Sequence, residues 1–346
     1  MPDQWNDKVF GANKENFESL ALEIFRFQYA NNPVYKAYVV ALQVNPSAVK
    51  QLEGIPFLPI RFFKSHAVQT TSFEPQAIFE SSGTTGSVNS RHLIRDLSLY
   101  EESFTKGFEH FYGPVKNWCI LGLLPSYLER KNASLVYMVD KLITLSEHPQ
   151  SGFYLDEYEQ LQAVLQELER REQKTLLVGV TFALLDLAER TAPDNYREKL
   201  KHTIIMETGG MKGRRVEMIR EEVHQLLKEA FIVPVIHSEY GMTEILSQAY
   251  SKGGGIFYCP PWMKVLVRDE EDPISVRHLE DDLAITNHPG SVRHLTGAIN
   301  IIDLANIYSC SFIATEDAGK IYSDESFEVL GRMDNSDLRG CSLMTI

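Results

Sequence analysis

The stretch whose residue types most clearly suggest chemistry is FESSGTTGSVNSRH, residues 79–92. Its two glycines let the backbone approach a ligand closely. The serine and threonine hydroxyls beside them, with free backbone N–H groups, form a cradle suited to phosphate oxygens. No lysine follows Gly86, so the stretch is not a Walker loop. A polar hairpin loop is the competing interpretation, because most clusters of Ser, Thr and Gly have that role. Taken alone, the stretch leaves both interpretations open.

Two later stretches carry residues of compatible chemistry. HSEYGMTE, residues 237–244, brings a tyrosine, a glycine, a threonine and a glutamate after the apolar run FIVPVI. EVLGRMDNSDLRGCS, residues 328–342, has Gly-Arg followed by acidic residues. In this order and at these distances, the three stretches resemble the adenylate-forming superfamily, which includes acyl-CoA synthetases, peptide-synthetase adenylation domains and luciferases.

Four further stretches carry a narrower resemblance: LPSYLERKNASL (124–135), METGGMKGRR (206–215), IIDLANIYSCSFIATEDAGKI (301–321) and the terminal LRGCS. They look like the acyl-protein synthetases (the LuxE family), whose type member activates fatty acids for the reductase of bacterial bioluminescence. The resemblance runs from about Pro56 to the C-terminus. It implies an α/β fold with layered α/β subdomains and a small β-barrel-like subdomain.

Composition restricts the possible partners. The 346 residues include 34 basic and 47 acidic groups, a net charge of −13. Nucleic acids and anionic membranes require a basic face, so neither is an expected partner. The N-terminus has no apolar signal-peptide core. The most apolar run, residues 175–189, is shorter than the roughly 20 residues of a spanning helix. We therefore expect a cytoplasmic protein without a membrane span.

Hydrophobic patterning predicts four regions along the chain. Residues 1–55 read as a helical cap, and residues 56–252 as an α/β core in which strands and helices alternate. Residues 253–332 read as a β-rich subdomain, followed by a short tail, 333–346. Parallel sheets bind ligands beyond the carboxyl ends of their strands. METGG and HSEYGMTE follow predicted strands at 203–206 and 231–236, which places them at that edge.

The C-terminal region departs from the superfamily pattern. Superfamily members usually continue after a Gly-Arg-Asp hinge into a lid domain that supplies a catalytic lysine. Only 14 residues follow Arg332 here (346 − 332 = 14), and domains rarely fall below about 50 residues. The expectation is a fold without that lid, as in the acyl-protein synthetases. The group that neutralises the leaving pyrophosphate is then open, with Lys212 or Arg130 as candidates.

The resemblance assigns ATP and Mg²⁺ as cofactors and gives each motif a role. Thr243 would contact the α-phosphate, and Glu244 would hold the magnesium through its oxygens. Tyr240 would stack on adenine, and Asp317 would accept hydrogen bonds from the ribose hydroxyls with help from Arg332. The remaining nucleotide-binding residues that the resemblance implies are Ser81, Ser82, Gly83, Thr84, Thr85, Gly86, Gly209, Gly210 and Gly241.

Several of these assignments have structural alternatives. Asp317 could be a turn residue before Gly319, and Asp303 in IIDLAN competes with it for the ribose. Tyr240 and Glu244 could be a packed tyrosine and a helix-start residue. His237 follows the predicted strand, so it could meet the substrate carboxylate as a catalytic residue or be a satisfied structural histidine.

The four cysteines have different expected roles. Cys119 and Cys310 lie in apolar runs typical of buried strands, and Cys259 precedes two prolines. None forms a Cys-x-x-Cys pair, so a structural zinc is not expected. In the resembled family, a cysteine near the C-terminus accepts the acyl group as a thioester. Cys341 matches it, and Arg339 nearby would favour the thiolate. The alternative is an unreactive tail thiol.

Three functions follow from the sequence. The first is an acyl-protein synthetase that converts a carboxylic acid, expected to be a fatty acid, to acyl-AMP and passes the acyl group to Cys341. The final recipient would be an acyl reductase or a carrier protein. The second is an acid ligase for aryl or acyl substrates whose acceptor is CoA or a small molecule. The third is a non-catalytic nucleotide- or acyl-binding homologue.

Overall fold

The computed structural model describes residues 4–81, 88–124, 132–155, 157–190, 199–209, 218–269, 272, 274–277 and 294–333. Contacts divide the chain into two compact units. Among the described residues, the first unit combines everything up to 103 with 242–248 and 258–333. The second combines 104–241 with 249–257. The motif HSEYGMTE is therefore shared: its first five residues belong to the second unit and its last three to the first.

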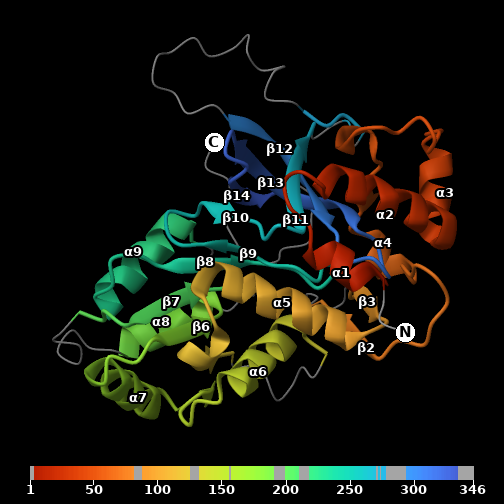
Figure 1. Cartoon of the computed structure of the whole chain (residues 1–346). Helices are drawn as coiled ribbons and strands as arrows, with labels where there is room; N and C mark the ends of the chain where they lie inside the picture. Colours follow the sequence, from red (N-terminus) through yellow and green to blue (C-terminus); the bar gives the residue numbers. More distant parts are fainter. Residues whose placement is uncertain are drawn as a thin grey trace, which may run out of the picture. The chain divides into compact units, whose positions relative to one another are not determined.

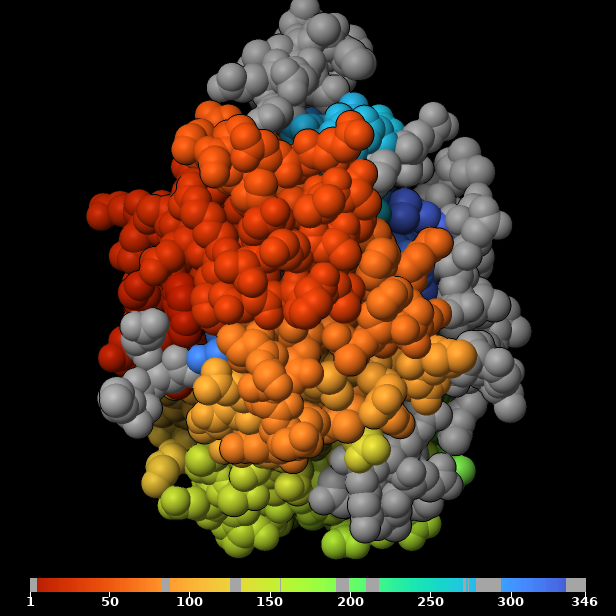
Figure 2. Space-filling model, turned by 90° about the vertical axis from the view of Figure 1, so that its right-hand side faces the viewer, coloured from red at the N-terminus to blue at the C-terminus, as the bar shows by residue number. Residues whose placement is uncertain are grey.

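Helices at the N-terminus of the first unit pack on its sheet through aromatic rings. Phe25 of α2 and Tyr35 of α3 both contact the Phe312 ring, at centroid distances of 6.2 and 6.1 Å. Tyr35 also donates a hydrogen bond to the Pro56 carbonyl at 2.6 Å. Figure 2 shows the N-terminal helices (red) meeting the segment after Pro56 (orange) on one face. The helical elements are α1 (Gln4–Phe10), α2 (Phe17–Asn31), α3 (Pro33–Ala41), the 3₁₀ turn Leu52–Gly54 and α4 (Phe62–Ser65).

An antiparallel sheet forms the rest of the first unit. Its strands pair in chain order, β11 (Met263–Arg268), β12 (His294–Asp303), β13 (Phe312–Tyr322) and β14 (Phe327–Arg332). The short strand β1 (Leu58–Pro59) adds to β13 in parallel. A separate hairpin pairs β2 (Ala77–Glu80) with β3 (Arg91–Ile94). The sequence predicts a strand over residues 78–80 that leads into the Ser/Thr/Gly stretch, and β2 confirms it.

The strand β13 corrects one prediction. The sequence predicts separate strands at 309–314 and 320–322, with Asp317 and Gly319 available for a turn between them. The structure instead has one continuous strand from Phe312 to Tyr322. A Cβ at Gly319 would lie 2.5 Å from the Glu328 carbonyl oxygen and 2.6 Å from the Ile299 side chain. The glycine is therefore explained by close strand packing, and the turn interpretation of Asp317 is wrong.

A parallel sheet with helices forms the second unit, as the alternating pattern predicts. The strands β5, β4, β6, β7 and β8 lie in that order, and β9 pairs antiparallel with β8. All residues of β4 and β6 are buried, as expected of apolar strands in a parallel sheet. Figure 1 shows α8 and α9 beside β6 and β7. The strands are β4 (Cys119–Leu123), β5 (Gly152–Phe153), β6 (Thr175–Gly179), β7 (Thr203–Glu207), β8 (His237–Tyr240) and β9 (Ala249–Ser251).

The helices of this part of the chain connect successive strands. In α7, buried leucines at positions 161, 165 and 168 form one face, while the helix is otherwise rich in charge. Among the described residues, no helix is long and apolar enough to cross a membrane. Along the chain, α5 and β10 pass from one unit to the other. The helices are α5 (Leu97–Tyr112), the 3₁₀ turn Val115–Asn117, α6 (Ser134–Ser146), α7 (Tyr158–Arg170), α8 (Thr181–Arg190) and α9 (Arg220–Phe231), and β10 is Phe257–Tyr258.

A second correction concerns the run FIVPVI. It was predicted to be a strand over 231–236, but α9 extends to Phe231, and β8 begins only at His237. Ile232 takes the left-handed conformation, with φ of +52°, and caps the helix. Pro234 has no N–H to donate to a sheet. The β-branched composition was therefore misleading, and His237 opens a strand instead of following one.

Candidate functional site

The Ser/Thr/Gly stretch is carried by the β2–β3 hairpin. Two hydrogen bonds between Ser81 and Ser90 close the base of the loop. Ser81 N donates to Ser90 O at 3.1 Å, and Ser90 N donates to Ser81 Oγ at 2.9 Å. Below them, Glu80 pairs with Arg91 and Phe79 with His92. The predicted phosphate residues Ser82, Gly83, Thr84, Thr85 and Gly86 lie outside the described residues. Their roles stay predictions.

In the first unit, the turn that contains Thr243 and Glu244 is held by two buried side chains. His92 Nδ1 lies 2.7 Å from the Thr243 carbonyl oxygen. Asn306 Nδ2 donates to the Glu244 carbonyl oxygen at 2.8 Å, and Asn306 Oδ1 lies 3.0 Å from His92 Nε2. Glu244 itself is fully buried. The two residues with proposed phosphate and magnesium roles therefore sit on a firmly supported backbone.

Asp303 supports the next residues of the same turn. Its carboxylate accepts hydrogen bonds from Leu246 N at 2.7 Å, from Ser247 N at 3.0 Å and Oγ at 2.6 Å, and from Ala305 N at 3.1 Å. Burial raises the pKa of Asp303, while these hydrogen bonds lower it, and the net pKa is above its ordinary value. The Asp303 carboxylate is fully buried, and its oxygens already accept four hydrogen bonds from other groups of the protein. This geometry favours Asp317 over Asp303 for the ribose.

Asp317 and Arg332 are direct partners across the β13–β14 ladder. Arg332 Nε lies 3.5 Å from Asp317 Oδ1, and its NH1 lies 3.8 Å from Glu316 Oε2. Both side chains retain some exposure, 15% for Asp317 and 17% for Arg332. A carboxylate has about four acceptor positions, so Asp317 can hold Arg332 and still accept two hydroxyls. The predicted pairing of these two residues is geometrically sound, and the ribose role stays a prediction.

The second unit holds the first half of HSEYGMTE. Tyr240 ends β8, where its ring lies 5.9 Å from that of Phe257, and Gly241 follows it. His237 Nδ1 lies 3.1 Å from the Tyr112 hydroxyl. Burial, with a smaller contribution from the charge of Lys252, lowers the pKa of His237 to about 4. The ring is neutral at pH 7 and has one nitrogen in a structural contact, and its catalytic role stays a prediction.

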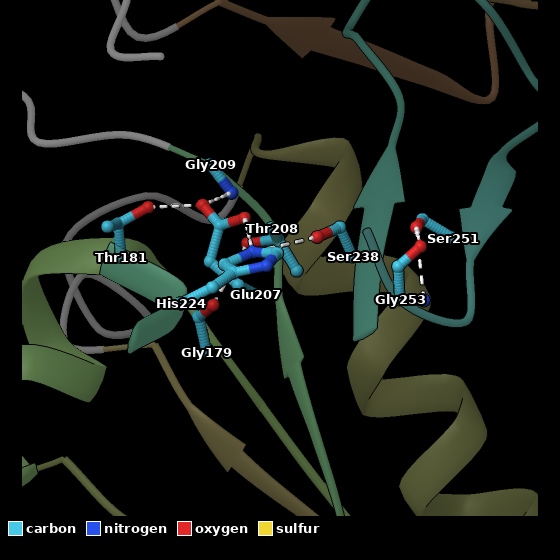
Figure 3. Close-up of polar contacts among 9 residues, drawn as sticks. All are labelled: Gly179, Thr181, Glu207, Thr208, Gly209, His224, Ser238, Ser251 and Gly253. Atoms are coloured by element: carbon cyan, nitrogen blue, oxygen red, sulfur yellow. Dashed lines mark hydrogen bonds and ion pairs between the residues drawn. The ribbon is translucent and has the colours of Figure 1, made fainter. Parts of the chain in front are cut away.

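The METGG stretch lies at the carboxyl end of β7, where Glu207 organises two neighbouring turns (Figure 3). Its Oε1 accepts hydrogen bonds from the Thr181 hydroxyl and from Gly209 N, the latter at 2.7 Å. Thr208 N donates to the Gly179 carbonyl at 3.0 Å. Gly209 has φ of +74°, which favours glycine there. The turns after β6 and β7 are therefore locked together; Gly210 lies outside the described residues.

His224 and Ser238 complete this cluster in the second unit. His224 Nε2 lies 3.9 Å from Glu207 Oε2 and 3.4 Å from Ser238 Oγ. Burial raises the pKa of Glu207. The hydrogen bonds from His224 and Thr181 and the charge of Arg220 lower it by more, so the net pKa is below its ordinary value. Glu207 is thus a buried, ionised carboxylate at the edge of the sheet where α/β proteins bind ligands.

Glu207→Gln should lower the free energy of unfolding at pH 7 by about 2 kcal/mol, since hydrogen bonds to a charged group are lost. The folded pKa is depressed, so this stabilisation is present above the unfolded pKa of about 4.5 and disappears as pH falls through the folded value. Urea unfolding at pH 7 and pH 3 measures the stability difference between the wild type and Glu207→Gln at each pH. Glu169→Gln is the control, because Glu169 binds backbone N–H groups at the start of β7 but is partly exposed. An equal effect at both pH values contradicts the prediction.

Glu239 in the same motif should give the opposite pH dependence. Burial and the charge of Glu207 raise its pKa from 4.5 to about 8. A carboxyl with a raised folded pKa costs stability as pH rises from the unfolded to the folded value. The Glu239 carboxyl should therefore subtract an increasing amount of stability between pH 4.5 and pH 8, so the stability of Glu239→Gln relative to the wild type should rise across that range. Melting temperatures across that range decide it; parallel profiles for the two proteins would refute it.

Comparison with known proteins identifies the family. The family model described as acyl-protein synthetase, LuxE, matches residues 9–345. The chain belongs to this family. A comparison with curated proteins gave no significant match. The resemblance drawn from the motifs is thereby confirmed, and it extends further toward the N-terminus than the motifs themselves.

Solved structures show the fold of this LuxE-family chain. ATP-bound MatB from Rhodopseudomonas palustris matches with 15% identity and a TM-score of 0.52, over 77% of this chain and 49% of that one. An ATP-bound RpMatB-BxBclM chimera gives the same score and identity over 76% and 49%. The luciferase-like enzyme of the nonluminescent mealworm Zophobas morio has 13% identity and a TM-score of 0.47, over 84% and 61%. The chain spans about half the length of the two ATP-bound structures. The α/β fold prediction is confirmed.

Three residues that organise the site of this LuxE-family chain were not singled out from the sequence. Asn306 lies in the LuxE-like stretch IIDLANIYSC, and His92 is the last residue of the stretch FESSGTTGSVNSRH, which gave it no role. Glu207 is the glutamate of METGG, a stretch in which the sequence predicts roles only for the two glycines. Each contacts residues distant in sequence, as His92 contacts Thr243 and Glu207 contacts Thr181, and local spacing carries no signal of such contacts. A polar residue inside an apolar run was the available clue.

Proposed function

We propose that this chain activates a carboxylic acid, a fatty acid in our assignment, with ATP to give acyl-AMP and pyrophosphate. It then transfers the acyl group to Cys341 and on to a partner protein such as an acyl reductase. The observation that carries the proposal is membership of the acyl-protein synthetase family across residues 9–345. The buried support of Thr243 and Glu244 adds to it, because it places those two residues on a rigid backbone.

The residues assigned to magnesium provide a single carboxylate, that of Glu244. Among the described residues, no group of three or more His, Cys, Asp or Glu side chains could hold a metal ion. Magnesium often needs only one or two carboxylates when phosphate oxygens complete its shell. Glu244 would supply the carboxylate, and the metal when bound would neutralise phosphate charge. Thr243 would orient the α-phosphate through its hydroxyl.

The reaction has two balanced steps. In the first, a carboxylate oxygen of the acid attacks the α-phosphorus of ATP, and the bond to the bridging oxygen of pyrophosphate breaks. In the second, the Cys341 thiolate attacks the acyl carbonyl and forms a thioester as AMP leaves with the electron pair of the acyl–oxygen bond. The thiol proton must leave first, because the thiolate is the nucleophile.

The other cysteines are poor acceptors, which supports Cys341. Burial raises the pKa of Cys119 to about 11 and that of Cys310 to about 12. Both are fully buried, as predicted, although Cys310 precedes β13 instead of lying in it. Burial also raises the pKa of Cys259 well above its ordinary value. All three thiols should be protonated at pH 7, so Cys341, outside the described residues, is the remaining candidate.

Cys341→Ser should abolish stable acyl labelling and leave acid activation intact. The wild type, incubated with ATP, magnesium and radiolabelled fatty acids, should carry a hydroxylamine-sensitive label. The variant should retain acid-dependent pyrophosphate exchange but lose that label, because serine cannot form a thioester. Cys259→Ser is the matched control and should label like the wild type. Labelling that persists in Cys341→Ser removes the acceptor assignment, and product formed only with added CoA favours an external acceptor.

A further inference from the structure

The turn with Thr243 and Glu244 rests on two buried polar side chains that neither reaction step uses. His92 and Asn306 are each only 1% exposed, and both belong to the same unit as the turn. We infer that His92 and Asn306 are positioning residues that fix the backbone of Thr243 and Glu244 for chemistry on the α-phosphate. The inference rests on the proposed function, because it concerns the residues assigned there to phosphate and magnesium.

Hydrogen bonding determines how the Asn306 amide is oriented. Its Nδ2 lies 2.8 Å from the carbonyl oxygens of both Glu244 and Cys310. Carbonyl oxygens only accept, so the nitrogen must face them, and Oδ1 must face His92. His92 therefore has an oxygen acceptor at each ring nitrogen, the Thr243 carbonyl at 2.7 Å and Asn306 Oδ1 at 3.0 Å. Burial lowers the pKa of His92 to about 4, so the ring has one N–H to donate.

Each of the two residues also ties the turn to a second element. His92 lies on β3 opposite Phe79, in the hairpin that carries the Ser/Thr/Gly stretch. Asn306 lies in the connection between β12 and β13, where α2 holds it: Gln28 Nε2 donates to the carbonyls of Asn306 at 3.1 Å and Ile307 at 2.9 Å. The turn is thus linked to the hairpin on one side and to the N-terminal helix on the other.

This arrangement matters because catalysis by alignment is sensitive to small displacements. A shift of about 1 Å in a group that aligns reacting atoms can cost about a hundredfold in rate. Without the two side chains, the Glu244 carbonyl loses its buried donor and the Thr243 carbonyl loses its 2.7 Å contact with His92, so the turn must move to find other partners. His92 contacts the backbone of Thr243 and so acts by positioning that residue. Loss of the His92 side chain should therefore reduce turnover more than ATP affinity.

The test compares graded variants at the two positions. His92→Asn retains an amide nitrogen at the δ position, where it can still donate to the Thr243 carbonyl, and His92→Leu cannot donate. Asn306→Leu removes both the amide nitrogen and the amide oxygen with little change in size. Tyr35→Phe is the control, because it removes a buried hydrogen bond to a carbonyl in the same unit and leaves the turn untouched. The readouts are kcat and the KM for ATP in acid-dependent pyrophosphate exchange, and hydrogen–deuterium exchange of a peptide covering 241–248.

We expect His92→Leu and Asn306→Leu to lower kcat by about a hundredfold with a small change in KM. His92→Asn should recover a large part of the loss, and Tyr35→Phe should match the wild type. Faster deuterium uptake over 241–248 should appear only in the two leucine variants. This uptake tests positioning even if the wild type shows no pyrophosphate exchange, a result that would instead refute the proposed function. Unchanged uptake, or equal kcat losses in the asparagine and leucine variants, overturns the inference.

Discussion

Glu244→Gln should lower acid-dependent pyrophosphate exchange by about a hundredfold or more at a magnesium concentration that saturates the wild type. Glutamine keeps the size of the side chain but not its negative charge, and a neutral amide is a weak ligand for magnesium. Glutamine is nearly isosteric with glutamate, so the change should leave the fold intact although Glu244 is fully buried. Exchange rates over a magnesium titration measure the effect, and part of the loss should be recovered at high magnesium.

Glu239→Gln provides a matched control in the same motif. Glu239 has a pKa raised to about 8, so at pH 7 its carboxyl is largely protonated already. Replacing a neutral acid with a neutral amide should leave pyrophosphate exchange near the wild-type rate. If Glu244→Gln retains the wild-type rate and magnesium requirement, Glu244 is not the metal ligand. If both variants lose activity equally, the charge of Glu244 is not the cause.

Asp303→Asn should lower the free energy of unfolding by about 3 kcal/mol. The carboxylate accepts four hydrogen bonds, two of them from the backbone N–H groups of Leu246 and Ser247. An asparagine presents an NH₂ group to part of this donor set, so at least one buried donor faces another. Urea unfolding followed by circular dichroism measures the loss.

Asp317→Asn separates the two candidate ribose residues. Asp317 is partly exposed and pairs with Arg332, so its replacement should cost about 1 kcal/mol or less in stability. The KM of the Asp317→Asn variant for ATP should instead rise, because an amide accepts hydrogen bonds from two ribose hydroxyls less well than a carboxylate does. Asp303→Asn should keep the wild-type KM in its folded fraction. The reverse pattern would transfer the ribose role to Asp303.

Local sequence predicted the elements of the second unit well. Strands β4, β6 and β7 are continuous apolar runs, and helices α7 and α8 show the expected periodicity or boundaries. Such patterns depend on neighbours a few residues apart, so they can be read in the chain itself. The error at FIVPVI arose because Phe231 is the buried last residue of α9 and Ile236 is buried just before β8, while Ile232 and Val235 between them are exposed.

By itself, the sequence determined the α/β class, the family resemblance and the residue types available for phosphate, metal and thioester chemistry. Motifs such as Tyr-Gly-Met-Thr-Glu are contiguous, so no fold is needed to recognise them. Only the tertiary structure decided that Asp303 is a structural carboxylate, that Asp317 lies within a strand, and that His92 and Asn306 hold the turn at Thr243. His92 and Thr243 are 151 positions apart, and a hydrogen bond over that separation exists only once folding has brought β3 against the turn that contains Thr243.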